Sequence, residues 1–382
     1  MDLQLSDDQE LFRETTARFI DARLPLPRVR ELADTPVAHD PALLGEAAEL
    51  GWFALFVPEE HGGGSVSGSA VRDAVIVAEE RGRFVQPGPF VATNVVASAL
   101  ARDGSAEQQS AHLPAFASGE RTASWAFTDR SGVPEVGAVR ASRSGPGASG
   151  DGYTLDGTAS LVPEGPSADL LLVSASDGAT DGGGVTQFVV DATAPGVTVT
   201  QLDGLDLTRR FADVRFDGTS VAASAVLGAP GGAQASVDAQ LDLAVALTLA
   251  ESIGAMRQLA EITVEYSKAR IAFGRPIGSF QALKHILADI SFWAEVSLAA
   301  AGAAADAVAD ARSTGSEIVS IAKAYVGEAG TQLAQQCLQV HGGIGFTWEH
   351  DLHFYLRRLA ADRVLYGDPQ WHRERICRIH GL

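Results

Sequence analysis

Two segments near the carboxyl end of the 382-residue chain contain side chains suited to binding a phosphate-bearing ligand. The first holds Arg270, Phe273 and Gly274, followed by Gln281. A guanidinium can bind a phosphate through two parallel hydrogen bonds, and a phenylalanine ring offers a flat surface to a purine. Arg270 also has a purely structural interpretation, because a cation near the last turn of a helix is stabilised by the helix dipole.

The second segment reads Gln-Val-His-Gly-Gly-Ile-Gly-Phe over residues 339–346. Glycines at the end of a helix let backbone amides approach a ligand closely. The same glycines could instead form a Schellman-type helix end followed by a tight turn. His341, His350 and His353 have no spacing typical of a metal centre, so no metal site is expected.

Long helices are expected to position both segments. Apolar periodicity predicts helices over about residues 233–271, 279–312 and 316–340, with a last one from about residue 350. Their length and short connections predict a helical bundle. It would form a C-terminal domain of residues 230–382.

Two further domains are expected before the bundle. Residues 1–121 read as helical, beginning with a capping box formed by Ser6 and Gln9. Residues 122–229 consist of short β-branched and aromatic runs separated by Gly, Pro, Asp and Ser, which predicts an all-β domain of barrel or sandwich type. The predicted fold class is therefore multidomain α+β, in the order helical, β, helical.

The composition narrows the range of partners. The formal net charge of −19 opposes a nucleic acid or an anionic membrane surface as main partner. Cys337 and Cys377, the two cysteines, have no ligand-like or framework-like spacing, which favours a reducing compartment. No basic, apolar leader is evident, and no apolar run approaches the roughly 20 residues that span a bilayer. We therefore expect a soluble cytoplasmic protein.

Taken together, the two segments closely resemble the acyl-CoA dehydrogenase family. That family shows an Arg-x-x-Phe-Gly turn followed by Phe-Gln, and later Gln-x-His-Gly-Gly-x-Gly-Phe. Further matches are Gly51-Trp52, residues 57–63 and Phe127-Thr128, so the resemblance covers essentially the whole chain. It implies an N-terminal helical domain, a middle β domain and a C-terminal four-helix bundle.

The resemblance also implies a reaction, the FAD-dependent α,β-dehydrogenation of an acyl thioester. A carboxylate removes the α-proton, and the β-hydrogen leaves as hydride to the flavin. In the family, the arginine turn and the glycine loop of one subunit hold the adenine and pyrophosphate of an FAD whose ring lies in a neighbour. The residues that this carry-over assigns to FAD binding are Arg270, Phe273, Gln281, Gln339, Gly342, Gly343 and Thr128.

The chain departs from the family pattern around the flavin ring and the base. Pro134 stands where a flavin-binding serine is usual, and Val162 where a threonine is usual. One family position for the base is occupied by Ala244. The other, Tyr-Glu-Gly-Thr, reads Tyr-Gly-Asp-Pro over residues 366–369, which makes Asp368 the candidate base. Asp before Pro is also a strong helix start, so Asp368 could be an N-cap, or serve both roles.

Two functions of different class therefore remain open. In the first, the chain is an active dehydrogenase that acts on an acyl-CoA or acyl-carrier thioester, as a homotetramer or within a mixed assembly, with an electron-transfer flavoprotein-like acceptor. In the second, it is a non-catalytic or half-site partner in a heterotetramer with a related subunit. The departures are similar to those of heteromeric acyl-CoA dehydrogenases, including those that act on steroid side chains. An oxidase that uses oxygen is a third option.

Overall fold

The computed structural model describes residues 5–35, 39–143, 152–178 and 184–382. The N-terminal part is helical, as expected. Its helices are α1 (Asp7–Arg23), α2 (Leu26–Ala33), α3 (Pro41–Glu49), α4 (Ala70–Arg83), α5 (Phe90–Asp103) and α6 (Ala106–Ala117). The predicted capping box at α1 is confirmed, since the Gln9 backbone amide donates to Ser6 Oγ and the Ser6 amide donates to Gln9 Oε1, each at 3.2 Å.

The middle part is one eight-stranded sheet in the order β6-β7-β3-β2-β4-β5-β8, with β1 added parallel to β4. The strands are β1 (Ala123–Ala126), β2 (Val139–Arg143), β3 (Gly152–Pro163), β4 (Leu170–Asp177), β5 (Val185–Asp191), β6 (Val197–Leu202), β7 (Phe211–Ala222) and β8 (Val226–Leu227). The expected β domain is confirmed. Within the described residues β6 and β8 are the two ends of the sheet and do not pair with each other, so of the two expected forms, barrel or sandwich, a closed barrel is not formed. Alternating apolar residues are common to open and closed sheets, and only strand pairing distinguishes them.

The C-terminal part is a bundle of long helices, which confirms the predicted order of helical, β and helical parts. The helices are α7 (Gln234–Ala269), α8 (Gln281–Ala309), α9 (Gly315–His341), α10 (Leu352–Val364) and α11 (Pro369–Ile379). The expected single last helix is therefore two helices. They are separated by a turn in which Tyr366 (φ 60°) and Gly367 (φ 101°) adopt positive φ angles that no α-helix can contain.

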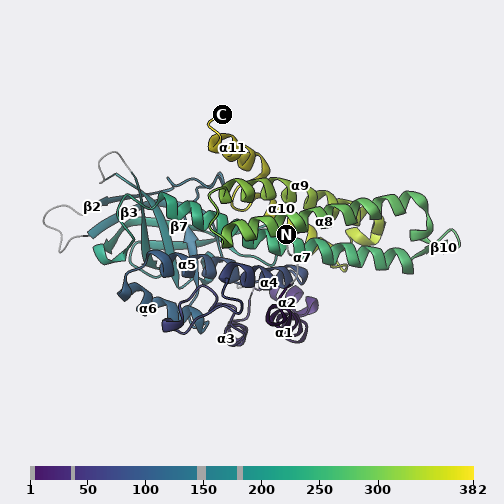
Figure 1. Ribbon diagram of the computed structural model, residues 1–382, viewed down its shortest axis with the longest axis horizontal. Helices are drawn as coiled ribbons and strands as arrows, with labels where there is room; N and C mark the ends of the chain where they lie inside the picture. Colours follow the sequence, from purple (N-terminus) through teal and green to yellow (C-terminus); the bar gives the residue numbers. More distant parts are fainter. Residues whose placement is uncertain (1–4, 36–38, 144–151, 179–183) are drawn as a thin grey trace.

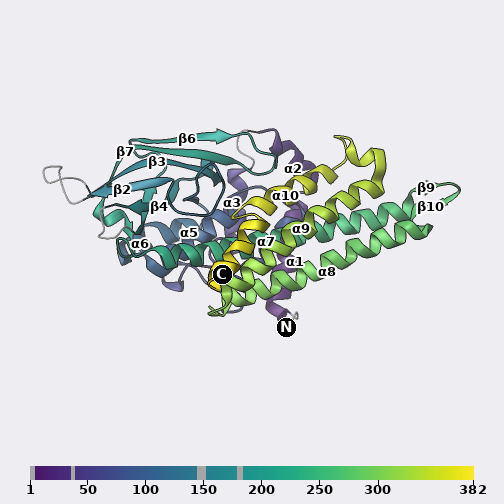
Figure 2. The same cartoon turned by 90° about the horizontal axis from the view of Figure 1, so that it is seen from above.

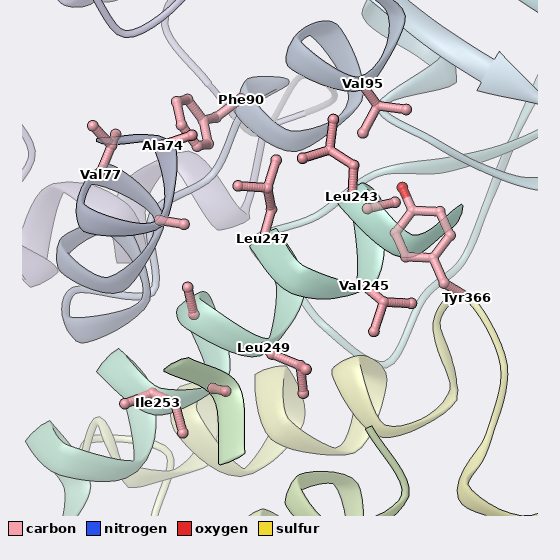
Figure 3. Packing of buried hydrophobic residues seen from close by; sticks show 14 of the residues in the cluster. Ala74, Val77, Phe90, Val95, Leu243, Val245, Leu247, Leu249, Ile253 and Tyr366 are labelled. Carbon is pink, nitrogen blue, oxygen red and sulfur yellow. The ribbon is translucent and has the colours of Figure 1, made fainter. Parts of the chain in front are cut away.

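The molecule is elongated, with the sheet at one end (Figures 1 and 2). At the opposite end, α7 and α8 are joined by a small hairpin of β9 (Ile271–Ala272) and β10 (Arg275–Pro276). Between the two ends, α7 runs through the main core, where Leu243 and Leu247 share an apolar cluster with Phe90 and Val95 of α5 (Figure 3). The arginine turn is therefore far from the sheet of its own chain.

By length and composition alone, helices α7 and α8 are long and apolar enough to span a bilayer. This corrects the expectation that no apolar segment of the chain would be long enough to do so. The core helix of a globular protein meets the same criterion. The apolar window of α7 is such a case, because 94% of it is buried within the chain. The corresponding window of α8 is only 22% buried, so this helix presents an apolar surface to its surroundings.

Candidate cofactor and substrate site

A cavity of about 440 Å³ lies between the β domain and helices α10 and α11. On the sheet side its wall is aromatic, because the rings of Trp125 and Phe127 stack with centroids 3.8 Å apart. Trp125 Nε1 donates to Ser174 Oγ at 2.9 Å, which fixes the indole. The opposite wall is formed by residues 360–361 and 364–368, so the cavity is a mainly apolar slot between two elements. Such a slot suits a flat ring system.

Thr128, predicted to contact the flavin, lies in the wall of this cavity, as does Pro134. The Thr128 hydroxyl donates to the carbonyl of Ser160 at 2.7 Å. The family pattern assigned Val162 to the flavin face, and the structure corrects this. A β-bulge between β3 and β7 gives Leu161 a φ of 55° and turns it into the cavity, whereas Val162 is buried in the β core.

Asp368, the candidate base, lines the same cavity and also caps α11. Its Oδ1 accepts from the backbone amide of Trp371 at 2.8 Å. The side chain is solvent-exposed and forms no ion pair with the described residues. Both roles left open by the sequence are therefore compatible with its position.

Gly367, which follows the tyrosine of the motif, has no room for a side chain. A Cβ atom there would lie 2.7 Å from Trp371 Cε3 and 3.0 Å from His372 Nε2. Its φ of 101° also disfavours any L side chain. A carboxylate directly after Tyr366 is therefore excluded by packing as well as by sequence.

Two buried carboxylates of α7, Asp242 and Glu251, form ion pairs. Arg375 donates to Asp242 at 2.7 Å, and Arg209 donates to Glu251. Ala244, at the alternative family position, is fully buried and carries no polar side-chain group. Within the described residues, α7 thus supplies no unpaired carboxylate to the cavity.

The structure adds two acidic residues that the sequence reasoning missed. Asp206 is buried in the cavity wall and accepts from Arg358 Nε at 2.6 Å. Burial alone would raise the pKa of Asp206, but the charges of Arg358 and Arg209 lower it below its ordinary value. Asp203 lies at the exposed rim and is not ion-paired to any described residue, so it is a second candidate base. Neither residue belongs to a sequence motif that would have pointed to it.

The other predicted FAD residues lie together at the far end of the molecule. Tyr266, one turn before Arg270, stacks on His341 with ring centroids 4.3 Å apart, and this contact joins the arginine turn to the glycine loop. Gly342 has a φ of 61°, and a Cβ atom added to Gly342 or Gly343 would meet nothing within 4 Å. Gln281 and Gln339 are exposed beside this turn and loop. The structure does not bring these residues to Thr128 or Asp368 (Figures 1 and 2).

The exposed end fits the adenine and pyrophosphate half of FAD. Phe273 is 95% exposed at a φ of 53°, an unusual state for a large apolar ring. Arg270 is the exposed C-cap of α7 and has no ion-pair partner among the described residues. A flat apolar ring, an unpaired guanidinium and open glycine amides form the donor set that a nucleotide needs. Since the cavity lies between the sheet and helices α10 and α11, away from this end, one FAD that uses both sites would have to lie across two subunits.

Comparison with known proteins agrees with this geometry. The patterns of the acyl-CoA dehydrogenase N-terminal and C-terminal domains match residues 6–120 and 232–380. The chain is 32% identical over 379 residues to the acyl-CoA dehydrogenase IpdE2 of Mycolicibacterium smegmatis, with 98% of each chain covered. The chain therefore belongs to the acyl-CoA dehydrogenase family. Its cofactor is FAD, and it is an oxidoreductase acting on CH–CH groups.

Two solved structures of paired chains are also similar. The ChsE4-ChsE5 complex of Mycobacterium tuberculosis matches with a TM-score of 0.88 at 28% identity, covering 100% of this chain and 99% of that one. A variant of the Tcur3481-Tcur3483 steroid ACAD matches with a TM-score of 0.85 at 27% identity, covering 98% of each chain. The fold of the whole chain is thus that of the family.

Proposed function

We propose that the chain performs FAD-dependent α,β-dehydrogenation of an acyl-CoA thioester in the cavity between the β domain and α10–α11. The supporting observation is an apolar slot of about 440 Å³ whose rim carries Asp368 without an ion-pair partner among the described residues. When bound, FAD supplies the hydride acceptor. Asp368 Oδ1 is engaged by the amide of Trp371, and the second carboxylate oxygen is the atom that would take the α-proton.

The residues around the slot would exclude water and orient the ligand. Trp125 and Phe127 form a rigid aromatic wall, and Leu161, at the β-bulge of β3, lines the slot beside them. In the proposed assembly, Arg270 and Phe273 of a neighbouring subunit would hold the pyrophosphate and adenine, and Gly342 and Gly343 would bring amides to them. The assembly would be a tetramer, and an electron-transfer flavoprotein-like protein would accept the electrons.

A second cavity of about 350 Å³ favours a CoA thioester. It shares Pro134 and Trp371 with the first cavity and also contains Arg378. Arg378 is exposed and pairs with exposed Glu135 at 3.2 Å. An exposed ion pair contributes little free energy in water, so a phosphate of CoA could replace Glu135 as the partner of Arg378.

A half-site role in a heteromeric enzyme is the second candidate. Asp368 already serves as an N-cap, and Gly367 excludes a carboxylate at the usual position. The relatives include complexes of two chains, among them one named as a steroid ACAD. In this role the chain would supply only Arg270, Phe273 and the glycine loop to an FAD whose ring and base belong to a related subunit.

The deciding experiment is the visible spectrum of the chain purified alone, followed by anaerobic titration with straight-chain and polycyclic acyl-CoA thioesters. A yellow protein whose flavin is bleached by one class of thioester supports autonomous dehydrogenation. A chain that retains FAD and turns over only when produced with a related subunit supports the half-site role. Turnover with oxygen as the sole acceptor would instead support an oxidase.

A further inference from the structure

The connection between β6 and β7, residues 203–210, is a junction between all three parts of the chain. Its residues 203–206 line the cavity. Arg357 Nη1 of α10 donates to the carbonyl of Leu205 at 3.0 Å, and Arg210 Nη2 donates to the carbonyl of Ala33, at the end of α2, at 2.9 Å. This connection therefore ties the sheet to both helical parts beside the site.

Arg209 makes the central contacts of this junction. One guanidinium nitrogen donates to Asp362 of α10 and the other to Glu251 of α7. The Arg209 side chain is only 10% exposed, and both carboxylates are more deeply buried. The guanidinium contacts the two carboxylates through two separate nitrogens of one rigid plane, a geometry that the single nitrogen of a lysine cannot reproduce.

The partners of Arg209 are held by further contacts. Asp362 Oδ2 accepts from Ser252 Oγ at 3.0 Å, and its backbone carbonyl accepts from Lys323. Glu251 Oε1 lies 3.7 Å from Arg81 Nε. The contacts join α4, α7, α9 and α10 to the β6–β7 connection, so the position of Asp362 is determined from several sides. The hydrogen bonds of Asp362 come from three different elements, and such a buried network restricts the movement of the groups that it joins.

Asp362 lies between residues that form the second wall of the cavity. Ala361 and Val364 line it, and the turn that follows carries Tyr366 and Asp368. We propose that Arg209 is a positioning residue, which sets the separation of the two cavity walls and holds the turn with Asp368 in place for the reaction. The assignment of a reaction step to Asp368 rests on the proposed function. The link between the walls rests only on the contacts of Arg209.

The test compares three proteins with the wild type. Arg209→Lys keeps the charge but replaces the two donor nitrogens of the rigid guanidinium by one. The triple variant Arg209→Met, Glu251→Gln, Asp362→Asn removes the guanidinium together with the charges of both its carboxylate partners, so neither carboxylate is left charged and buried without Arg209. Arg81 loses its ion pair with Glu251 but keeps its hydrogen bond to the Pro87 carbonyl. This variant is the second test of the link should Arg209→Lys fail to fold. Arg215→Met is the matched control, because Arg215 lies on β7 and pairs with Asp217 in solvent.

Hydrogen–deuterium exchange measures the link without any need for activity. We expect exchange about tenfold faster in residues 203–208 and 360–368 of Arg209→Lys and of the triple variant, with α1 and α6 unchanged. Arg215→Met should match the wild type. Faster exchange over the whole chain would show a merely structural role, and unchanged exchange in the two segments would exclude the link.

Kinetics then test the positioning of Asp368, on protein normalised to its bound flavin. Arg209→Lys should lower kcat about tenfold with KM within about twofold, because the base is displaced while the binding surface remains. An unchanged kcat beside faster local exchange would overturn the positioning role. If the wild type shows no turnover, the proposed function fails by itself, and the exchange result still decides whether Arg209 links the walls.

Discussion

At the scale of single residues, Asp368 illustrates how one carboxylate can serve stability and chemistry together. Its Oδ1 caps α11 through the amide of Trp371, and the side chain remains at the rim of the cavity. The cap needs an oxygen acceptor, whereas proton removal needs a carboxylate. Substitution by asparagine separates these two requirements.

We predict that Asp368→Asn changes the free energy of unfolding by less than about 0.5 kcal/mol, because asparagine caps helices as well as aspartate. The same change should abolish flavin bleaching by substrate, measured anaerobically. Asp368→Ala should also lose about 1 kcal/mol of stability in urea unfolding. The control is Asp203→Asn at the same cavity. If that variant loses bleaching while Asp368→Asn retains it, Asp203 is the base.

His372 predicts a pH dependence of stability. The ring is fully buried, and its Nε2 lies 3.0 Å from the Tyr366 carbonyl. Burial, and then the charge of Lys323, lowers the pKa of His372 from 6.5 to about 3. Between these two values the unfolded chain binds a proton that the folded chain does not, so stability falls as pH falls below 6.5. At pH 5 the loss from this residue is about 2 kcal/mol relative to pH 8.

His372→Gln isolates that contribution, because glutamine can still donate to the Tyr366 carbonyl but does not titrate. The measurement is the free energy of unfolding in urea at pH 8 and at pH 5 for both proteins. The difference between the two pH values should be about 2 kcal/mol smaller in the variant. Equal differences would mean that His372 is protonated in the folded protein at pH 5.

At the scale of elements, the crossing of α4 and α7 depends on two glycines. A Cβ atom at Gly82 would lie 1.9 Å from the carbonyl oxygen of Glu251, and one at Gly254 would lie 1.9 Å from that of Glu79. In both cases the obstacle is the backbone of the opposite helix, which cannot turn aside as a side chain does. The close approach also brings Glu251 to the network around Arg209.

We expect Gly254→Ala to destabilise the protein by about 3 kcal/mol, because the two helices must move apart. The matched control is Gly45→Ala in α3, where nothing lies within 4 Å of the added Cβ. Alanine is the better helix former there, so the control should gain up to about 1 kcal/mol. Thermal unfolding of the three proteins measures both effects. An unchanged midpoint for Gly254→Ala would contradict the close crossing.

At the scale of the whole molecule, several large exposed apolar residues lie on α8 and near the arginine turn and the glycine loop. Phe292 is exposed on α8, and Phe273 and Trp348 are exposed near the arginine turn and the glycine loop. Large exposed apolar side chains of this kind are typical of protein interfaces. They are consistent with the proposed tetramer, in which α8 and the FAD end would meet neighbouring subunits.

We predict that Phe292→Glu yields particles of lower mass in size-exclusion chromatography with light scattering, and that FAD is lost with the assembly. Phe273→Ala should keep the assembly but retain FAD at least about tenfold more weakly, since base–aromatic stacking is worth roughly 1–3 kcal/mol. Leu11→Glu, at another exposed apolar residue on α1, is the control. FAD retention by monomeric Phe292→Glu would contradict a cofactor shared between subunits.

Local signals explain which parts of the fold were predictable from the sequence. The capping box of Ser6 and Gln9 involves residues three apart, and the long α7 (Gln234–Ala269) was predicted within two residues at each end. Apolar periodicity and caps act within one or two turns of chain, so they can be recognised without a structure. The arginine turn and the glycine loop were recognisable for the same reason.

The order of helical and β parts, the family and its cofactor, and the identity of the departures at Pro134, Gly367 and Asp368 were determined by the sequence alone. Only the tertiary structure decided that the sheet is open, that Leu161 rather than Val162 faces the cavity, and that Asp203 stands at its rim. The contacts of Arg209 with Glu251 and Asp362 were also evident only from the tertiary structure. These features depend on strand pairing and on contacts between residues far apart in the chain, which no local pattern of residue types encodes.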